Sequence, residues 1–205
     1  MSKVQVDTID TRSGTSTMQI GSTNTSTINI GVSGDTVNIP SGVTIANAGT
    51  ATGFGDANTP AFSVQLGFNQ SQSVSDATNT KVELDSEYFD TDSAFDTSTY
   101  RFTCPSGKAG KYFFTWCIFL YQDDVSNLQA GEAMLYLNGS KYINAMTVYQ
   151  NNYIRYLTKG SSAFLDLSVG DYVELYGNVN SVSGGSPQFY GGDRATFLTG
   201  FRVTT

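Results

Sequence analysis

The chain has 205 residues and a formal net charge of −7, and only 14% of its residues are charged. Neutralising a phosphate backbone takes clustered Lys and Arg, so this balance argues against a nucleic-acid partner. The sequence has no histidine, which excludes imidazole catalysis and His metal ligands, and no apolar run is long enough to insert into a membrane.

Residues 1–45 form a repetitive, aromatic-free segment, because all aromatic residues of the chain lie from Phe54 onward. It is rich in Ser and Thr and carries four apolar-polar-apolar triplets, at 18–20, 28–30, 37–39 and 43–45. This period of two is typical of a strand with one apolar face. Such short strands bury too little surface alone, so the segment is either a disordered tether or a shaft in which several copies wrap together. The regular recurrence favours the shaft or virion anchor.

The opening residues 3–9, KVQVDTI, resemble the first residues of short fibre proteins from marine bacteriophages. Residues 46–60, with small side chains, three glycines and a terminal Pro, read as a linker. We therefore place the domains at 1–45 for the anchor or shaft, 46–60 for the linker and 61–205 for a globular head.

The head is expected to be all-β, because short candidate strands follow one another without helical periodicity. Turn signals separate them, among them Asn138-Gly139, Lys159-Gly160 and the polar loop 178–193. This pattern predicts a β-sandwich or jelly roll. The expected strands are 61–68, 80–84, 112–121, 132–137, 141–150, 153–157, 162–167, 172–176 and 195–203.

The strand at 112–121 is unusual, because Thr115 is its only residue that is neither apolar nor aromatic. We expect it to be buried on both faces, and an antiparallel strand of that kind needs a second cover. Another subunit can supply that cover. Two cysteines, Cys104 and Cys117, flank the preceding turn, and their spacing does not decide between free thiols and a disulfide.

Six acidic residues lie between Glu83 and Asp96. They could ligate Ca²⁺, but they lack the spacing and the glycine of a helix-loop-helix calcium loop, so a solvated acidic loop is the expectation. No nucleophile elbow or phosphate-cradling motif is present. We predict no catalytic residue, no metal site and no cofactor, and hence no enzyme.

Five segments, in a fixed order, carry a family resemblance: 61–64 (AFSV), 95–105 (FDTSTYRFTCP), 110–114 (GKYFF), 170–173 (GDYV) and 196–201 (TFLTGF). Together they resemble the complement globular-head family, which shares the trimeric jelly roll of the tumour-necrosis-factor type. Two departures concern the turn. Tyr100 stands where the family generally has Gly, and the stretch between Phe102 and Gly110 is two residues longer than usual.

The resemblance implies a ten-stranded sandwich that forms a homotrimer through one sheet. Tyr112, Phe114 and Trp116 share one face of their strand and are the candidate trimer interface; the alternative is that they are intradomain core. In that case the other face of the strand, with Phe113, Cys117 and Phe119, makes the contact. Complement-type heads bind ligands, so we place possible binding loops at 122–131 and 178–193.

Phe189 and Tyr190 are the candidate binding residues of the second loop. The function predicted is that of a bacteriophage virion protein, made in the host cytoplasm: a short trimeric fibre or a capsid or tail decoration. Its N-terminus would join other virion proteins, and its head would bind the host surface, with a cell-surface glycan as a possible ligand. The alternatives are a purely architectural role and a polysaccharide-cleaving fibre.

Overall fold

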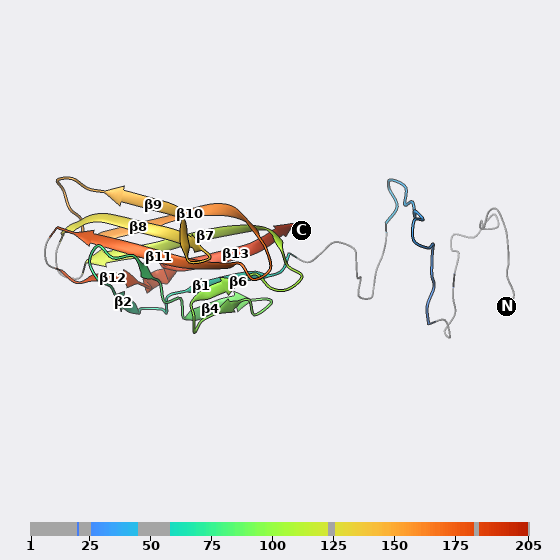
Figure 1. Cartoon of the computed structure of the whole chain (residues 1–205), viewed down its shortest axis with the longest axis horizontal. Coiled ribbons are helices and arrows are strands. Elements are labelled where there is room, and N and C mark those ends of the chain that lie inside the picture. Colours follow the sequence, from blue (N-terminus) through green and yellow to red (C-terminus); the bar gives the residue numbers. More distant parts are fainter. Residues whose placement is uncertain (1–19, 21–25, 45–57, 123–125, 183–184, 205) are drawn as a thin grey trace. The chain divides into compact units, whose positions relative to one another are not determined.

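The computed structural model describes residues 20, 26–44, 58–122, 126–182 and 185–204 of the chain (Figure 1). The chain divides into two compact units, residues 1–52 and residues 53–205. Most of the predicted linker 46–60 lies outside the described residues, as do Met18 and Ile45 of the outer triplets. The linker boundaries therefore stay a prediction.

The described part of the first unit, residues 20 and 26–44, contains turns and no strand. One turn is closed by the Asp35 carboxylate, which accepts a hydrogen bond of 2.9 Å from the Val32 amide. The apolar side chains of the two central triplets are exposed in the single chain. A shaft would need other copies to cover them, and it stays a prediction.

The second unit is a jelly-roll β-sandwich, as the sequence predicts (Figure 1). Its only helical element among the described residues is the short 3₁₀ turn η1 (Gly192–Arg194), and no helix there is long and apolar enough to cross a bilayer. The strands are β1 (Ala61–Gln65), β2 (Ser71–Ser73), β3 (Thr80–Lys81), β4 (Ser86–Asp90), β5 (Phe95–Asp96), β6 (Arg101–Thr103), β7 (Gly110–Gln122), β8 (Leu128–Leu137), β9 (Ser140–Val148), β10 (Tyr156–Leu167), β11 (Tyr172–Ser181), β12 (Pro187–Tyr190) and β13 (Phe197–Thr204).

Two antiparallel sheets make up the sandwich. Sheet A has seven strands in the order β2-β12-β7-β13-β1-β4, with β10 along the other edge of β7. One edge of β7 is shared, because β13 pairs with its first part and β12 with its end. Sheet B has six strands in the order β5-β6-β11-β8-β9, with β3 also paired to β11. Strand β7 thus pairs with three strands of sheet A and lies next to the edge strand β10.

The core lies between the sheets and is built on the inward side of β7. Successive side chains of a strand point to opposite faces, and those of Tyr112, Phe114 and Trp116 point inward and are fully buried. Aromatic rings from other strands meet them: Phe102 lies 5.7 Å from Phe114 and 4.9 Å from Phe62, between ring centroids. The interior is therefore filled by aromatic packing within one chain.

Two turn predictions have opposite outcomes. Asn138-Gly139 forms the β8–β9 hairpin turn with φ values of 51° and 76°, which confirms that prediction. Lys159-Gly160 is not a turn, because β10 runs unbroken from Tyr156 to Leu167. A Cβ at residue 160 would lie 2.2 Å from the Trp116 carbonyl oxygen, so Gly160 permits β10 to approach β7 closely.

The predicted loop 178–193 is largely strand. β11 continues to Ser181, and β12 forms between β2 and β7. Tyr100, at the position where the family has Gly, adopts φ 54°. The left-handed backbone of this turn is therefore kept with a tyrosine in place of glycine, at some cost in strain.

Candidate functional site: an uncharged aromatic sheet face

The outward surface of sheet A carries a row of aromatic side chains that none of the described strands covers. β7 contributes the odd-numbered residues from Phe113 to Tyr121, and the register brings neighbours from β10, β12 and β13 beside them. We call this surface the aromatic face. Its members are Phe113, Phe119, Tyr121, Tyr156, Phe164, Tyr190 and Phe201.

Three phenylalanines form one end of the aromatic face. Phe113 lies opposite Phe164 on β10 and opposite Phe201 on β13, with ring centroids 5.1 and 5.5 Å apart. Phe164 is 66% exposed and Phe201 is 38% exposed. We call these three residues the phenylalanine cluster. A group of large, purely apolar side chains open to water is typical of a surface that contacts another protein.

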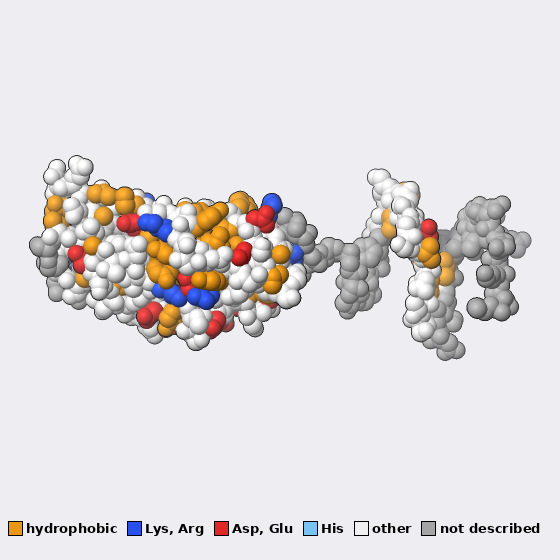
Figure 2. All heavy atoms as spheres, viewed as in Figure 1, with side chains coloured by type: hydrophobic (Ala, Val, Ile, Leu, Met, Phe, Trp, Pro, Cys, Tyr) orange, Lys and Arg blue, Asp and Glu red, His pale blue; other side chains and the backbone are white. Residues whose placement is uncertain are grey.

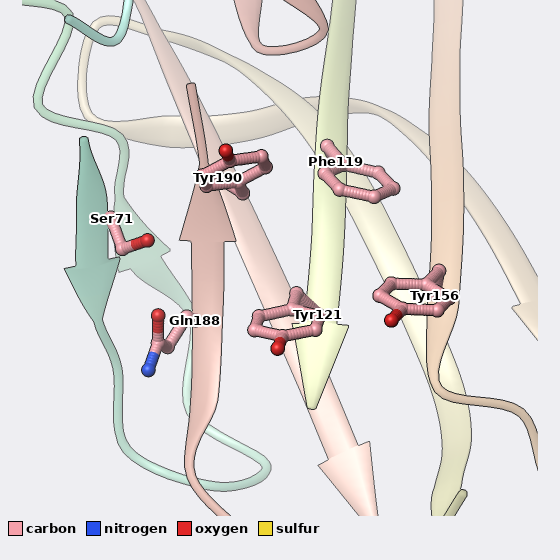
Figure 3. A pocket seen from close by; sticks show the side chains of 6 residues that line it. All are labelled: Ser71, Phe119, Tyr121, Tyr156, Gln188 and Tyr190. Carbon is pink, nitrogen blue, oxygen red and sulfur yellow. The ribbon is translucent and has the colours of Figure 1, made fainter. Parts of the chain in front are cut away.

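The other end of the aromatic face is a hollow of about 360 Å³ (Figure 3). Tyr121 follows Phe113 by eight residues, roughly 26 Å along an extended strand. The Tyr156 ring stacks on Tyr121 at 5.2 Å and on Phe119 at 5.9 Å, with interplanar angles of 10° and 5°. We call this cavity the tyrosine hollow. It is lined by Ser71, Phe119, Tyr121, Tyr156, Gln188 and Tyr190.

Residues outside the hollow hold its rings in place. The Arg155 guanidinium donates a 2.9 Å hydrogen bond to the Tyr121 hydroxyl and lies 5.3 Å from the Tyr156 ring centroid. The Thr196 hydroxyl donates to the Tyr190 carbonyl at 2.7 Å and accepts from the Phe119 amide at 2.9 Å. A Cβ at Gly192 would lie 2.1 Å from the Tyr190 ring. The absence of a side chain at residue 192 therefore leaves space for that ring.

The candidate site residues predicted from the sequence lie in different environments in the structure. Tyr112, Phe114 and Trp116 are fully buried in the core of the single chain, which is the alternative left open for them, and leave the opposite face as the candidate for a subunit contact. Phe189 is also fully buried, because β12 inserts it between the sheets, and it presents no surface to a ligand in the single chain. Tyr190 lies in the tyrosine hollow, where its role in binding stays a prediction.

Sequence reasoning missed Tyr156, Phe164 and Phe201. The first two were assigned to separate short strands with a turn between them, which hid their shared parity along β10. Residues 156–164 read YLTKGSSAF and do not alternate between apolar and polar side chains, so no local signal joined the two segments into one strand. Phe201 was recognised only as part of a terminal strand, and its facing depends on the register with β7.

Acidic side chains of the loop region are used locally. The Asp90 carboxylate accepts from the Phe95 amide at 2.7 Å, and the Asp85 carboxylate accepts from the Gly67 amide at 2.8 Å. Hydrogen bonds from Ser98 and then Thr99 lower the pKa of Asp96 to about 2. Across the described ranges no group of three or more His, Cys, Asp or Glu side chains is arranged to hold a metal ion.

Charge is sparse on the head, and part of it forms ion pairs. Glu174, which is almost fully buried on the outer side of sheet B, accepts from Lys81 at 2.7 Å and from Arg101 at 2.8 Å. The face drawn in Figure 2 carries a few side chains of either sign among hydrophobic and uncharged ones. At the phenylalanine end of sheet A, Lys111 pairs with Asp166 at 3.4 Å.

The two cysteines are free and lie on opposite sides of sheet A. Cys104 is buried in the core, and Cys117 lies half-buried on the outward side of β7, between the phenylalanine cluster and the tyrosine hollow. Burial raises the pKa of both thiols above the ordinary value. Neither thiol is therefore primed as a nucleophile.

The model of one protein family, the C1q domain, matches residues 61–201. Among solved structures, the globular domain of zebrafish complement 1qA is 18% identical with a TM-score of 0.49 and covers 71% of this chain and 98% of its own. Murine APRIL is 12% identical with a TM-score of 0.49, over 70% of this chain and 98% of its own. The Eiger TNF of S. frugiperda is 14% identical with a TM-score of 0.47, over 71% and 94%. No curated protein matches the chain.

Proposed function

This chain belongs to the C1q-domain family, and we propose on that premise that its head works as a homotrimeric binding module on the outside of a bacteriophage particle. The head would be a structural and adhesive part and not an enzyme. Three copies would meet through the phenylalanine cluster at one end of the aromatic face of sheet A. The N-terminal segment would join the head to other proteins of the capsid or tail, and the head would contact the host cell surface.

The phenylalanine cluster is the observation that carries the trimer. Full burial of a phenylalanine side chain contributes roughly 1.5–3 kcal/mol relative to leaving it in water. Phe164 and Phe201 retain 66% and 38% of their exposure in the single chain, so a covering subunit gains much of that amount at each. All three members of the cluster are phenylalanines, and the neighbouring charges on this face, Lys111 and Asp166, pair with one another at 3.4 Å.

A ring of three also needs a second, different surface. Contacts in a cyclic trimer are heterologous, so the phenylalanine cluster of one copy meets another region of the next. Strand β9 offers such a region, because it is an edge strand of sheet B with a half-exposed apolar strip. Tyr142, Met146 and Val148 make up this strip and alternate with inward residues. Covering β9 would also protect an open sheet edge.

The N-terminal segment supports the virion setting. Its opening residues 3–9 resemble those of short phage fibre proteins, and its repeated triplets expose Ile28, Ile30, Val37 and Ile39 in the single chain. These apolar side chains can be buried when several copies wrap around a shared axis. A trimeric head would hold three such segments together at high effective concentration.

Sedimentation equilibrium of the full chain tests the assembly. We expect a single species of about three times the 22.0 kDa chain mass at micromolar concentration. A 22.0 kDa species under these conditions would contradict the trimer.

Competition for adsorption tests the adhesive role. Purified protein should slow the attachment of the parent phage to its host in a dose-dependent way. An intact trimer that leaves adsorption unchanged would leave the head with an architectural role in the particle.

A further inference from the structure

We propose that the tyrosine hollow binds an uncharged sugar ring. This proposal rests on the proposed function, because it names the class of ligand that the same head would bind. The hollow has about 360 Å³ of open volume, within the range of small-ligand pockets. It lies at the end of β7 opposite the phenylalanine cluster (Figure 3).

The lining matches the two chemical sides of a pyranose. Aromatic rings of Phe119, Tyr121 and Tyr156 supply flat apolar surface for the C–H face of the sugar. The Ser71 hydroxyl, the Gln188 amide and the tyrosine hydroxyls can donate to and accept from the sugar hydroxyls. A few polar groups around an apolar wall are what fixes the orientation of a small ligand.

The absence of charge selects among sugars. None of the six lining side chains is an acid or a cation. The nearby Arg155 guanidinium is engaged, because it donates to the Tyr121 hydroxyl and, at 3.2 Å, to the Gln122 carbonyl. A carboxylated sugar would therefore find no cation among the lining side chains, and because the Arg155 guanidinium donates to protein acceptors, the carboxylate would lose hydration without a direct ion pair. We infer that the hollow favours a neutral hexose over a uronic acid.

The polar groups that line the hollow favour an arrangement in which the hollow stays open when the heads assemble. The phenylalanine cluster loses only apolar surface when a subunit covers it. The hollow would place a serine hydroxyl, a primary amide and three phenols against a protein surface, and each buried polar group without a partner costs about 1–3 kcal/mol. A hydroxyl-rich ligand satisfies these groups. The two ends of one face thus suit different partners.

The rings are also held in position before any ligand arrives. Tyr121 is fixed by Arg155, Tyr190 has its space from Gly192, and Phe119 and Tyr156 are stacked in parallel. A preorganised site avoids the cost of ordering side chains on binding. Small, rigid aromatic platforms are accordingly suited to weak ligands that gain from several copies on one particle.

Saturation-transfer NMR on the full chain tests the hollow with two probes of the same ring. Methyl β-D-glucopyranoside carries no charge, and methyl β-D-glucuronopyranoside carries a carboxylate. We expect saturation transfer to the ring C–H protons of the neutral probe, and at least fivefold weaker binding of the charged one. Equal or stronger binding of the glucuronide would overturn the assignment of a neutral ligand, and silence from both probes would overturn the site.

Variants at the half-exposed Tyr156 locate the contact. Tyr156→Ala removes the ring and should weaken the neutral probe about tenfold, whereas Tyr156→Phe keeps the stacking surface and should lose no more than about threefold. Tyr88→Ala is the matched control, because Tyr88 is an exposed tyrosine on β4 outside the hollow. Unchanged binding in Tyr156→Ala would place the sugar elsewhere and sink the proposal.

Sedimentation of the same samples separates the two proposals. A trimer that binds neither probe contradicts the hollow and leaves the assembly standing. A monomer that binds the neutral probe supports the hollow and contradicts the trimer. A fall in mass on Tyr156→Ala would mean that a second copy fills the hollow, and the sugar proposal would then be wrong.

Discussion

The two faces of β7 are nearly equal in aromatic content and opposite in environment. On the inward side, Tyr112, Phe114 and Trp116 are enclosed by rings from other strands of the same chain. On the outward side, Phe113, Phe119 and Tyr121 have aromatic neighbours within sheet A and no second layer among the described residues of the head. The inward face contributes to folding the head, and the outward face is available for assembly and recognition.

The outward face is itself divided. At one end the phenylalanine cluster carries no polar atom, and at the other the tyrosine hollow mixes rings with hydroxyls and an amide. The same strand can therefore offer a surface suited to another protein and a surface suited to a small polar ligand. This division lets separate substitutions change folding, assembly and binding one at a time.

The largest effect is expected on the inward face. Phe114→Ala removes a fully buried ring that packs against Phe62 and Phe102, and it should lower the free energy of unfolding by about 3–5 kcal/mol. Urea denaturation followed by tryptophan fluorescence measures this. Phe113→Ala, one residue away on the outward face, is the control and should cost far less in the monomeric state. Similar losses for both variants would contradict the distinction between the faces.

A smaller loss is expected where the two longest strands of sheet A approach one another. Gly160→Ala would place a methyl group 2.2 Å from the Trp116 carbonyl oxygen, so β10 must shift away from β7. Overpacking of this kind costs about 1–3 kcal/mol, seen as a lower urea midpoint. Ser162→Ala, on the same strand and exposed, should leave the midpoint unchanged. An unaltered Gly160→Ala protein would contradict the close packing of these strands.

The smallest effect concerns the two thiols on the opposite sides of sheet A. Burial raises the pKa of Cys104 and Cys117 above the ordinary 9.0, so the reactive thiolate is scarcer at pH 8 than in an exposed cysteine. Alkylation by iodoacetamide should be slow and should accelerate as the pH rises beyond 9. The raised pKa predicts this direction, because the thiols of the folded chain lose their protons at a higher pH than an exposed cysteine does.

The thiols also report on assembly. Cys117 should become more reactive in a variant that dissociates the trimer, since it lies on the outward side of β7, whereas Cys104 should not change. Mass spectrometry of alkylated peptides measures each site. Equal protection of Cys117 in assembled and dissociated protein would argue that a subunit does not cover the middle of the aromatic face.

Much of the fold was predictable, because it depends on local signals. The period of two, the Asn138-Gly139 turn and the ordered family segments predicted an all-β jelly roll, and the structure has one. Predictions failed where a signal has two meanings. Gly160 marks a turn in many sequences, but here it permits close packing, and the Gly- and Ser-rich stretch after Asn178 contains β12.

The facing of β7 could not be read from its own residues. Both parities of the strand are aromatic, so the alternation tells which side chains share a face but not which face is inward. Phe62 and Phe102, which lie far away in sequence, decide it by packing against Phe114. The tyrosine hollow depends likewise on the register of β10 and β12 against β7. Local patterns of apolar and polar residues do not reveal such long-range strand pairings.

Replacing the most exposed ring of the phenylalanine cluster tests the central claim, that this end of the aromatic face joins the subunits. Phe164→Asp should reduce the mass of the full chain at sedimentation equilibrium from three copies to one, because its charge would be buried without a partner. Phe68→Asp is the matched control, since Phe68 is 61% exposed and Phe164 is 66% exposed, and it should leave three copies. A Phe164→Asp protein that stays folded and sediments as three copies would contradict the account.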